Sequence, residues 1–398
     1  MKKIIYLCAM MLLCLNMMAQ IDPYDGNWDT IVFDDFSTPN RFWYSWSFKS
    51  NDDLWRAYPG SGVTHGKELQ VYQFDNCHFN DNDNVMELVA EYDTSHRIPI
   101  NDYDLPSWMH PSHGGLGYPD NDSLFYFSGT INYVKRHRNT EEGYFRYGFF
   151  EIKCKLPIHQ GAFPAFWLWH GDSIQEDPHY EEIDIFEYSW RFEDTQHHFS
   201  PNPHGAGNPY CFTSGIYYND TSSYGGYKVS YARNFPMIGD SLSHWHTFAC
   251  EWMPEHVIWY CDGQVVNEFH DRAHIPHHAL VLKANYSIDD YALQDYTRGN
   301  PPEWKGNDAM IIDYVKVIQL QWDCDQDETI VSQTDLDSFN YAVKKSISIT
   351  ADNGLVKVVN TDKVTFRATD FFEITGPFQV DSGGEMTVIM QSCPTPER

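Results

Sequence analysis

The stretch of sequence that decides the fold is Glu182-Ile183-Asp184-Ile185-Phe186-Glu187. In a β-strand successive side chains alternate between the two faces, so Glu182 and Asp184 share one face while the isoleucines point into the core. Simple alternation would place Glu187 on the apolar face. An extra residue of the β-bulge type at Ile185-Phe186 resets the alternation and returns Glu187 to the carboxylate side. A helix would spread the acids around its axis, so the pattern predicts a strand with three carboxylates in one row.

Three like charges side by side destabilise a strand unless they are used, because each raises the proton affinity of its neighbours. Glycoside hydrolysis requires two neighbouring acids. One carboxylate attacks the anomeric carbon, and one protonated acid donates its proton to the leaving oxygen. Residues two apart on a strand are about 6.6 Å apart, and a retaining glycosidase holds its two carboxyl groups about 5–5.5 Å apart. A solvent-facing strand edge and a calcium site are the alternatives that fit the same acids.

The chain around this stretch has short aromatic runs separated by turn residues, which is typical of β proteins. Tyr, Phe and Trp number 26, 25 and 13, and these residues suit pleated sheets. No 3.6-residue apolar period is sustained long enough to predict a major helix. We therefore expect an all-β fold, with strands in 145–156, 162–169, 182–188, 245–252, 257–261 and 310–320.

Aromatic residues also lie close to the acidic stretch in sequence. Phe163, Trp167 and Trp169 occupy alternating positions of the run before it, and Trp190 follows it. Such a stripe is either part of the core or a platform on which sugar rings stack, because the apolar face of a sugar packs well on an aromatic ring.

The charge of the chain excludes some classes of partner. It carries 27 basic and 56 acidic residues, a formal charge of −29. This excess of acid repels phosphate backbones and anionic lipid surfaces, so neither nucleic acid nor a membrane surface is expected as a partner. A neutral ligand fits better.

Residues 1–19 are expected to be a secretory signal peptide, with a basic start at Lys2 and Lys3, a short apolar run and Ala19 at the cleavage point. The apolar run is shorter than the ~20 residues that a membrane span requires. We expect export to the periplasm, the cell surface or the medium. Of the nine cysteines, Cys8 and Cys14 lie in this peptide, which leaves seven. An odd number cannot pair completely, so a few disulfides at most and several buried thiols are expected.

A change of composition marks a boundary near residue 322. The acidic stretch 322–328 contains the last tryptophan of the chain, and alternating runs at 346–350, 363–367 and 386–390 follow it. We expect a main domain over 20–322 and a small β module over 323–398 whose role the sequence does not indicate. About seventy residues are marginal for independent folding.

With these residues in view, the chain resembles glycoside hydrolase family 16. The acidic stretch matches the family signature E-[I/L/V]-D-x-x-E of the bulge-containing branch in full. Further stretches similar to the family, in the expected order, are 127–131, 147–153, 246–252, 259–263 and 311–317. The resemblance covers roughly residues 28–320. The members of the family that the chain resembles include laminarinases and agarases.

The resemblance implies a concanavalin-like jelly roll that acts on internal bonds of a β-linked polysaccharide, with no required cofactor, as a monomer. By position, Glu182 is similar to the family nucleophile, Glu187 to its acid/base and Asp184 to the assisting carboxylate. The aromatic residues Phe163, Trp167, Trp169 and Trp190 are then expected to bind substrate. Family members often hold a structural calcium, and Asp313 falls where a ligand for it can sit.

For the substrate we expect a β-1,3- or β-1,3-1,4-glucan, supported by the acidic surface. Two features depart from the β-1,3-glucanases: Phe163 stands where Trp is usual, and 178–181 replaces a Gly-containing lead into the signature. An algal galactan such as agarose, porphyran or carrageenan is the alternative, for which the basic run 135–138 could neutralise sulfates. A non-catalytic polysaccharide-binding protein on the same fold and a transglycosylase remain as further alternatives.

Overall fold

The computed structural model describes residues 28–38, 42–43, 54–57, 70–93, 95, 98–99, 123–124, 126–134, 143–159, 161–170, 181–188, 209–219, 229–230, 238–288, 304, 306–339, 341–359 and 362–393. Contacts divide the chain into two compact units, Thr30–Gln319 and Leu320–Cys393, with Trp28 and Asp29 grouped with the second. The predicted boundary at residue 322 falls on the first residue of a strand of the second unit.

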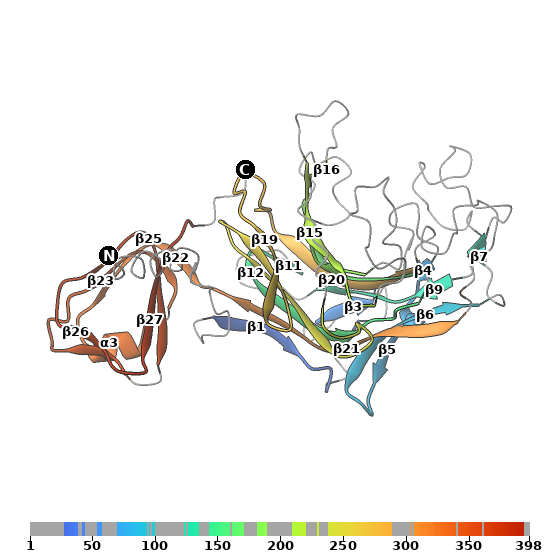
Figure 1. Cartoon of the computed structure of the whole chain (residues 1–398), viewed down its shortest axis with the longest axis horizontal. Coiled ribbons are helices and arrows are strands. Elements are labelled where there is room, and N and C mark those ends of the chain that lie inside the picture. The colour runs from blue at the N-terminus through green and yellow to red at the C-terminus, as the bar shows by residue number, and fades with distance from the viewer. Residues whose placement is uncertain are drawn as a thin grey trace, which may run out of the picture. The chain divides into compact units, whose positions relative to one another are not determined.

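The larger unit is a two-sheet β-sandwich of the jelly-roll type (Figure 1). Its first sheet runs in the order β19-β18-β17-β12-β21-β6-β9-β4, with β1 on β21 and β5 on β6. The strands are β1 Asp29–Asp34, β4 Gln70–Tyr72, β5 Cys77–Asn80, β6 Val85–Tyr92, β9 Tyr126–Ser128, β12 Gly148–Lys155, β17 His246–Trp252, β18 Val257–Cys261, β19 Gln264–Phe269 and β21 Asn307–Gln319. A short 3-10 turn, η2 Phe74–Asn76, precedes β5.

The second sheet carries the acidic stretch and runs β16-β15-β14-β13-β20-β10-β3-β2, with β11 on β20. Its strands are β2 Phe42–Trp43, β3 Trp55–Ala57, β10 Thr130–Tyr133, β11 Tyr144–Phe145, β13 Ala162–Trp169, β14 Glu181–Glu187, β15 Thr213–Asn219, β16 Val229–Ser230 and β20 Leu280–Ile288. A separate hairpin joins β7 Ile98–Pro99 to β8 Ser123–Leu124. The prediction of an all-β sandwich is confirmed.

Contacts between the sheets identify which face of β14 is the inner one. The Phe186 ring on β14 lies 4.5 Å, centroid to centroid, from the Phe248 ring on β17 of the first sheet. The indole N–H of Trp259 on β18 donates to the backbone oxygen of Asp184 at 2.8 Å. The face of β14 that bears Phe186 therefore packs in the core, and the opposite face is turned away from the first sheet.

One predicted strand, 145–156, is divided in the structure into β11 and β12. The break lies at Tyr147, whose φ of 60° is in the left-handed region, and at Gly148, whose φ is 138°. A Cβ on Gly148 would lie 2.8 Å from the backbone oxygen of Ile318. The chain therefore leaves the second sheet and enters the first at this point, which an alternating pattern of apolar residues does not reveal.

The second unit is a small β module whose paired strands are parallel. Four strands pair in the order β22-β23-β25-β27 and two more as β24-β26. Its elements are β22 Trp322–Ile330, α3 Gln333–Asp337, β23 Val343–Ile349, β24 Val356–Val358, β25 Lys363–Ile374, β26 Phe378–Val380 and β27 Glu385–Met390. Ile347, Val356 and Phe366 are fully buried in its own core.

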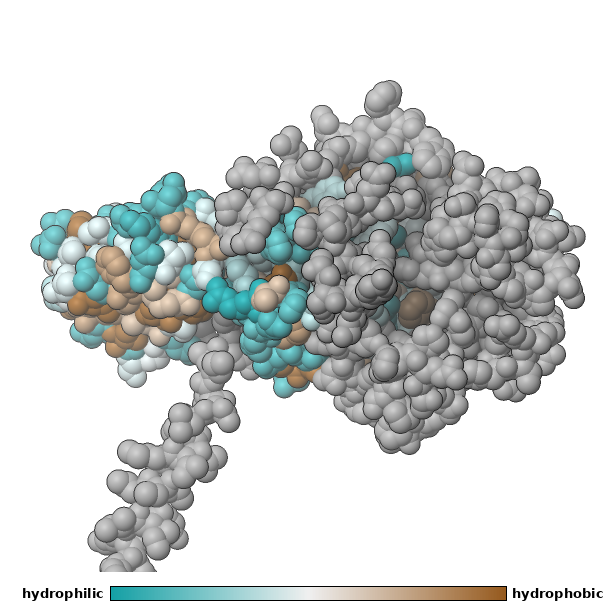
Figure 2. All heavy atoms as spheres, turned by 90° about the horizontal axis from the view of Figure 1, so that it is seen from above, coloured by the Kyte–Doolittle hydropathy of each residue, from teal (hydrophilic) through white to brown (hydrophobic). Residues whose placement is uncertain are grey.

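Apolar residues also remain on the surface of this unit. Large exposed side chains include Phe371 at 47% and Met390 at 50% of their full exposure, and Figure 2 shows apolar surface on the unit. Apolar area left in water contributes nothing to hydrophobic stabilisation. The folded state of so small a unit therefore depends more on stabilisation from sources other than its core, such as covalent crosslinks.

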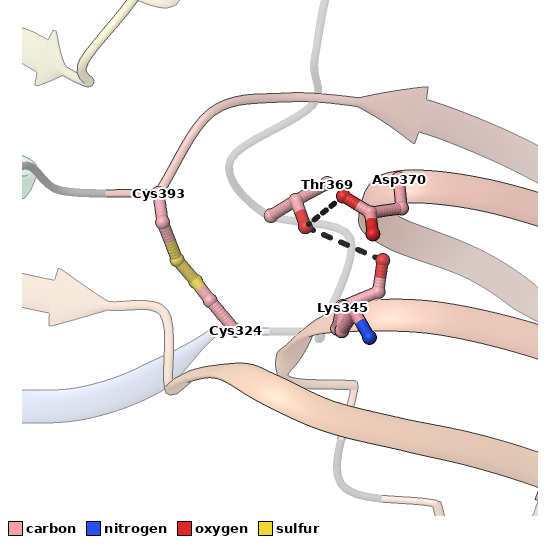
Figure 3. The surroundings of a disulfide bond; sticks show 5 residues. All are labelled: Cys324, Lys345, Thr369, Asp370 and Cys393. Atoms are coloured by element: carbon pink, nitrogen blue, oxygen red, sulfur yellow. Dashed lines mark hydrogen bonds between the residues drawn. A yellow bond between two sulfur atoms is a disulfide. The ribbon is translucent and has the colours of Figure 1, made fainter.

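A disulfide supplies one such constraint. Cys324 and Cys393 are bonded across 69 residues of sequence, with Cα atoms 6.2 Å apart (Figure 3). Nearby, the hydroxyl of Thr369 donates to the backbone oxygen of Lys345 at 3.3 Å. Among the described cysteines the other five are buried thiols, namely Cys77, Cys154, Cys211, Cys250 and Cys261. The bond encloses nearly the whole of the second unit.

Removing this bond should destabilise the second unit without affecting the first. We expect the double variant Cys324→Ser, Cys393→Ser to lower its free energy of unfolding by about 2–4 kcal/mol, because a long closed loop restricts the unfolded chain. Urea unfolding followed by circular dichroism checks this, and reducing the unaltered protein with dithiothreitol should reproduce the same shift. An unchanged unfolding midpoint in both cases would show that the crosslink contributes no stability.

Among the helices of the described residues, none is long and apolar enough to cross a membrane.

Candidate active site

The three acids of the signature lie on β14, and the extra residue is at Ile185. On the β13 side, Trp167 faces Asp184 and Phe166 faces Phe186, so Ile185 has no counterpart. On the β15 side the register also shifts between Asp184 and Glu187. A bulge of this kind leaves both Ile185 and Phe186 on the inner face, where they are 1% and 0% exposed.

The bulge returns the third acid to the outer face. Glu182 faces Trp169, Asp184 faces Trp167 and Glu187 faces Ala165 on the neighbouring strand β13. Directly paired residues of antiparallel strands project from the same face. Glu182, Asp184 and Glu187 therefore form one row on the face of the sheet turned away from the core.

The surroundings of the three carboxylates differ. Glu182 is 6% and Asp184 1% exposed, whereas Glu187 is partly exposed. The hydroxyl of Thr213 on β15 lies 3.4 Å from Oε2 of Glu187 and can donate to it. Asp184, the middle acid, is thus the most enclosed of the three. Glu187, the acid that we expect to exchange protons, is the most accessible.

Two of the four predicted aromatic residues flank the row directly. Trp167 and Trp169 lie beside Asp184 and Glu182, and Trp167 is 7% exposed while Trp169 is partly exposed. Phe163 is on the same face of β13, two residues beyond Ala165, and is partly exposed. Trp190 lies outside the described residues. Trp167 is largely packed in, so Trp169 offers the more accessible indole beside the carboxylates.

A polar network on β20 holds Trp167 in place. Its indole N–H donates to Oδ1 of Asn285 at 2.6 Å. The side-chain amide of Asn285 in turn donates to the hydroxyls of Tyr72 at 3.1 Å and Ser287 at 2.8 Å. Tyr72 and Ser287 are hydrogen-bonded to each other at 2.7 Å. A buried, satisfied network of this kind fixes the orientation of the indole next to Asp184.

A lysine lies among the tryptophans. The ammonium of Lys283 on β20 is 5.0 Å from the centre of the Trp167 ring and 5.2 Å from that of Trp169. Lys283 is only 7% exposed. The negative faces of two indole rings partly compensate the loss of water around the charge.

The register extends this row of residues across the sheet. Asp184 pairs with Trp167, Trp167 with Lys283, Lys283 with Asn132 and Asn132 with Arg56. The face that carries the acids on β14 thus carries two cations on β20 and β3. A polymer lying across the strands would pass from the carboxylates to these cations.

Sequence reasoning missed Lys283 and Asn285, although a signal was present. In β20 the polar residues Lys283, Asn285 and Ser287 alternate with Leu282, Ala284 and Tyr286. Alternation of this kind is typical of a strand with one face in the core and one in a polar environment. What the sequence could not indicate is that this polar face lies beside the acidic row.

The predicted calcium ligand lies elsewhere in the fold. Asp313 is on β21 of the first sheet, and its Oδ2 is 2.6 Å from the ammonium of Lys153, with both side chains about one-third exposed. This ion pair already provides a counter-charge for the carboxylate. A calcium ion at Asp313 stays a prediction.

The same part of the chain matches a known family. Residues 130–290, which include β13, β14, β15 and β20, match the family model described as Glycosyl hydrolases family 16. This part of the chain is therefore similar to the family 16 glycoside hydrolases. The match covers the whole acidic row, the tryptophans beside it and the polar face of β20.

Two curated proteins from Rhizobium meliloti (strain 1021) are similar to this chain. Endo-1,3-1,4-beta-glycanase EglC is 29% identical over 181 residues, which are 44% of this chain and 31% of the relative. Endo-1,3-1,4-beta-glycanase ExsH is 25% identical over 181 residues, with the same shares of 44% and 31%. The matching region thus spans about one-third of the length of these relatives.

Solved structures are similar to the chain at lower identity. The laminarinase catalytic domain from Thermotoga maritima MSB8 is 19% identical, with a TM-score of 0.47, over 73% of this chain and 98% of that one. The glycoside hydrolase family 16 endo-glucanase from Bacteroides ovatus is 18% identical, with a TM-score of 0.47, over 72% of this chain and 99% of that one.

Proposed function

We propose that the larger unit is a family 16 glycoside hydrolase, a retaining endo-β-glycosidase that hydrolyses internal bonds of a β-linked polysaccharide. The observation that carries the proposal is the row of Glu182, Asp184 and Glu187 on one face of β14, which exists only because of the bulge at Ile185. A non-catalytic sugar-binding protein has no use for three aligned acids, two of them buried.

In the first step the carboxylate of Glu182 attacks the anomeric carbon, and the bond from that carbon to the leaving oxygen breaks. Glu187 gives its proton to the leaving oxygen, so one half of the polymer departs as an alcohol. The products are a glycosyl ester on Glu182 and a carboxylate on Glu187. Asp184, which is 1% exposed, lies between the two on the same face of β14.

In the second step Glu187 takes a proton from water, whose oxygen attacks the anomeric carbon. The ester bond breaks, the carboxylate of Glu182 is restored and Glu187 is again protonated. Two inversions at the same carbon give a product of retained configuration. A sugar hydroxyl in place of the water would give transglycosylation by the same steps.

As substrate we propose a β-1,3- or β-1,3-1,4-glucan. Two curated relatives of the domain bear the name endo-1,3-1,4-beta-glycanase. The net charge of −29 disfavours a polyanion, and Trp169 offers a partly exposed ring beside Glu182.

A sulfated algal galactan is the second candidate, favoured by the cations that the structure places on the same face. Lys283 and Arg56 lie in the row that begins at Asp184. A sulfate held by a lysine or arginine forms a charge-assisted hydrogen bond, which is stronger than a neutral one.

A panel of polysaccharides tests the proposal. Laminarin, mixed-linkage glucan, agarose, porphyran and carrageenan are each incubated with the full-length protein, and reducing ends and product lengths are measured. We expect short oligosaccharides of several lengths from the glucans, as for cleavage of internal bonds. Binding without release of reducing ends would replace the enzyme with a polysaccharide-binding protein.

Replacing Lys283 with methionine distinguishes the two substrate classes. On a neutral glucan we expect kcat/KM to fall by less than roughly 10-fold, because a side chain of similar length still packs between the indoles. Activity on glucan should also change little between 50 and 500 mM salt, since screening acts on charge interactions. On a sulfated galactan, a loss of kcat/KM of more than roughly 100-fold in this variant, together with strong salt dependence in the unaltered protein, would indicate that the ammonium binds a sulfate.

We also propose export through the signal peptide at 1–19, a monomeric state and a structural calcium ion at Asp313. These features rest on the sequence and its resemblance to the family. The signal peptide lies outside the described residues.

A further inference from the structure

A second polar cluster lies at the start of β14, one residue before the nucleophile but on the opposite face of the strand. Glu181 is 7% exposed and pairs with Tyr218 of β15. Its carboxylate accepts the backbone N–H groups of His277, at 3.2 and 3.4 Å, and of His278, at 3.0 Å. The two histidines precede β20, so Glu181 joins this segment to the catalytic strand.

The imidazoles of the same two residues also approach the carboxylate. Nδ1 of His277 is 3.5 Å from Oε1 of Glu181, and Nδ1 of His278 is 3.1 Å from Oε2. One ligand atom from each residue lies within 4.8 Å of the others. Ligands at about 2.0–2.2 Å in a tetrahedral zinc site are about 3.4 Å from one another. The spacing of the carboxylate and the two ring nitrogens therefore matches that of zinc ligands.

The positions of these groups are fixed by further contacts. The N–H groups that bind the Glu181 carboxylate act as the outer hydrogen bonds that orient a metal ligand. The indole N–H of Trp252 on β17 donates to the backbone oxygen of Pro276 at 2.8 Å and anchors the histidine segment.

We propose that Glu181, His277 and His278 bind one zinc ion. Imidazole and carboxylate ligands favour zinc over calcium or magnesium, which take oxygen ligands alone. Three protein ligands leave the fourth tetrahedral position to a water molecule. The ion would link β14, the strand that carries the proposed nucleophile, to the segment before β20.

The other group with suitable spacing in the described part of the chain, His246, Cys261 and Asp262, differs in two ways. Both ring nitrogens of His246 are already hydrogen-bonded, Nδ1 to Asp262 at 2.7 Å and Nε2 to the backbone oxygen of Ser241 at 3.0 Å. Burial raises the pKa of the Cys261 thiol to about 12, so the thiolate that a metal requires is disfavoured. This group is a hydrogen-bonded network, and it provides an internal comparison for the zinc site.

Zinc binding is measured directly on the untagged full-length protein after chelation and dialysis. We expect isothermal titration with zinc to give one site per chain and a rise in Tm on binding. Cobalt as a spectroscopic substitute should show the strong visible absorption of a tetrahedral site. Calcium should give neither effect. Because no readout depends on activity, failure of the zinc site is distinguishable from failure of the proposed glycosidase.

Variants separate a metal site from a simple hydrogen-bonded tie. Glu181→Gln keeps an acceptor oxygen for the backbone N–H groups but loses the charge, and we expect zinc affinity to fall by at least roughly 100-fold, as it should for His278→Ala. His274→Ala is the matched control: His274 lies in the same segment and pairs with Asp271 at 2.7 Å. It should bind zinc as the unaltered protein does.

Three results would overturn the proposal. The first is a titration without a stoichiometric site, and the second is equal zinc affinity in the Glu181→Gln and unaltered proteins. The third is a lower Tm in Glu181→Gln with no change of Tm on adding zinc to either protein, which would leave Glu181 as a hydrogen-bonded tie only.

Discussion

Glu187→Ala should still form the glycosyl ester on Glu182 when the leaving group needs no proton, as with an aryl glycoside of low leaving-group pKa. The ester should then accumulate, because no base remains to activate water. Azide, which needs no base, should restore turnover and give a glycosyl azide of retained configuration. The ester is detected by mass spectrometry and the azide configuration by proton NMR.

Glu182→Ala should behave differently, although the same chemical group is removed. Without a nucleophile, kcat/KM on polysaccharide should fall by at least roughly 10,000-fold. Any azide product should be inverted, because azide then attacks from the side that Glu182 occupied. The opposite stereochemistry in the two variants would exchange the roles of Glu182 and Glu187. An inverted sugar from the unaltered enzyme would contradict the covalent mechanism.

The second large effect depends on which face of β14 each acid occupies. Deleting Ile183 makes Glu182 and Asp184 neighbours, which puts them on opposite faces of β14. We expect activity to fall to the level of Glu182→Ala, because nucleophile and acid/base no longer share a face. Polysaccharide hydrolysis is the measurement, with circular dichroism to verify that the sheet is retained.

Deleting Ile185 is the matched comparison, because it also removes one isoleucine from the same strand. Ile185 is the residue without a counterpart on β13, so its deletion leaves Phe166 facing Phe186 and Ala165 facing Glu187. All three acids then remain on the outer face, and detectable activity should survive. The lost buried side chain should lower the free energy of unfolding by about 2–5 kcal/mol. If both deletion variants fold and are equally inactive, the bulge is required for activity in some way beyond placing the three acids on one face.

The pattern of the sequence is sufficient for the strand β14 and the position of its bulge. Three acids cannot share one strand face at the spacing of Glu182, Asp184 and Glu187 unless one residue is added between the last two. Alternation is a local property of the backbone, so it is visible in the sequence. The same holds for the all-β class and for β23, β25 and β27 of the second unit, whose alternating runs are local as well.

Local patterns failed where the chain changes sheets. The run 145–156 has one continuous apolar pattern, yet its first residue, Phe145, pairs with β20, whereas the residues from Gly148 to Lys155 pair with β17 and β21. The left-handed φ of Tyr147 is imposed by that transfer. Tyrosine has no intrinsic preference for this conformation, so the residue itself carries no signal.

By itself the sequence determined the elements and the chemical groups: the acidic row on one strand, the aromatic positions before it and the parity of the cysteines. Only the tertiary structure decided which groups meet. Lys283 is about a hundred residues from Trp167 in sequence, yet the pairing of β20 with β13 brings its ammonium to 5.0 Å from the indole. Tertiary structure also brings His278 to 3.1 Å from Glu181. Within the second unit it brings Cys324 to Cys393, 69 residues away in sequence. The physical reason is that alternation within a strand is fixed by backbone geometry, whereas the choice of neighbouring strand depends on burial summed over the whole sandwich.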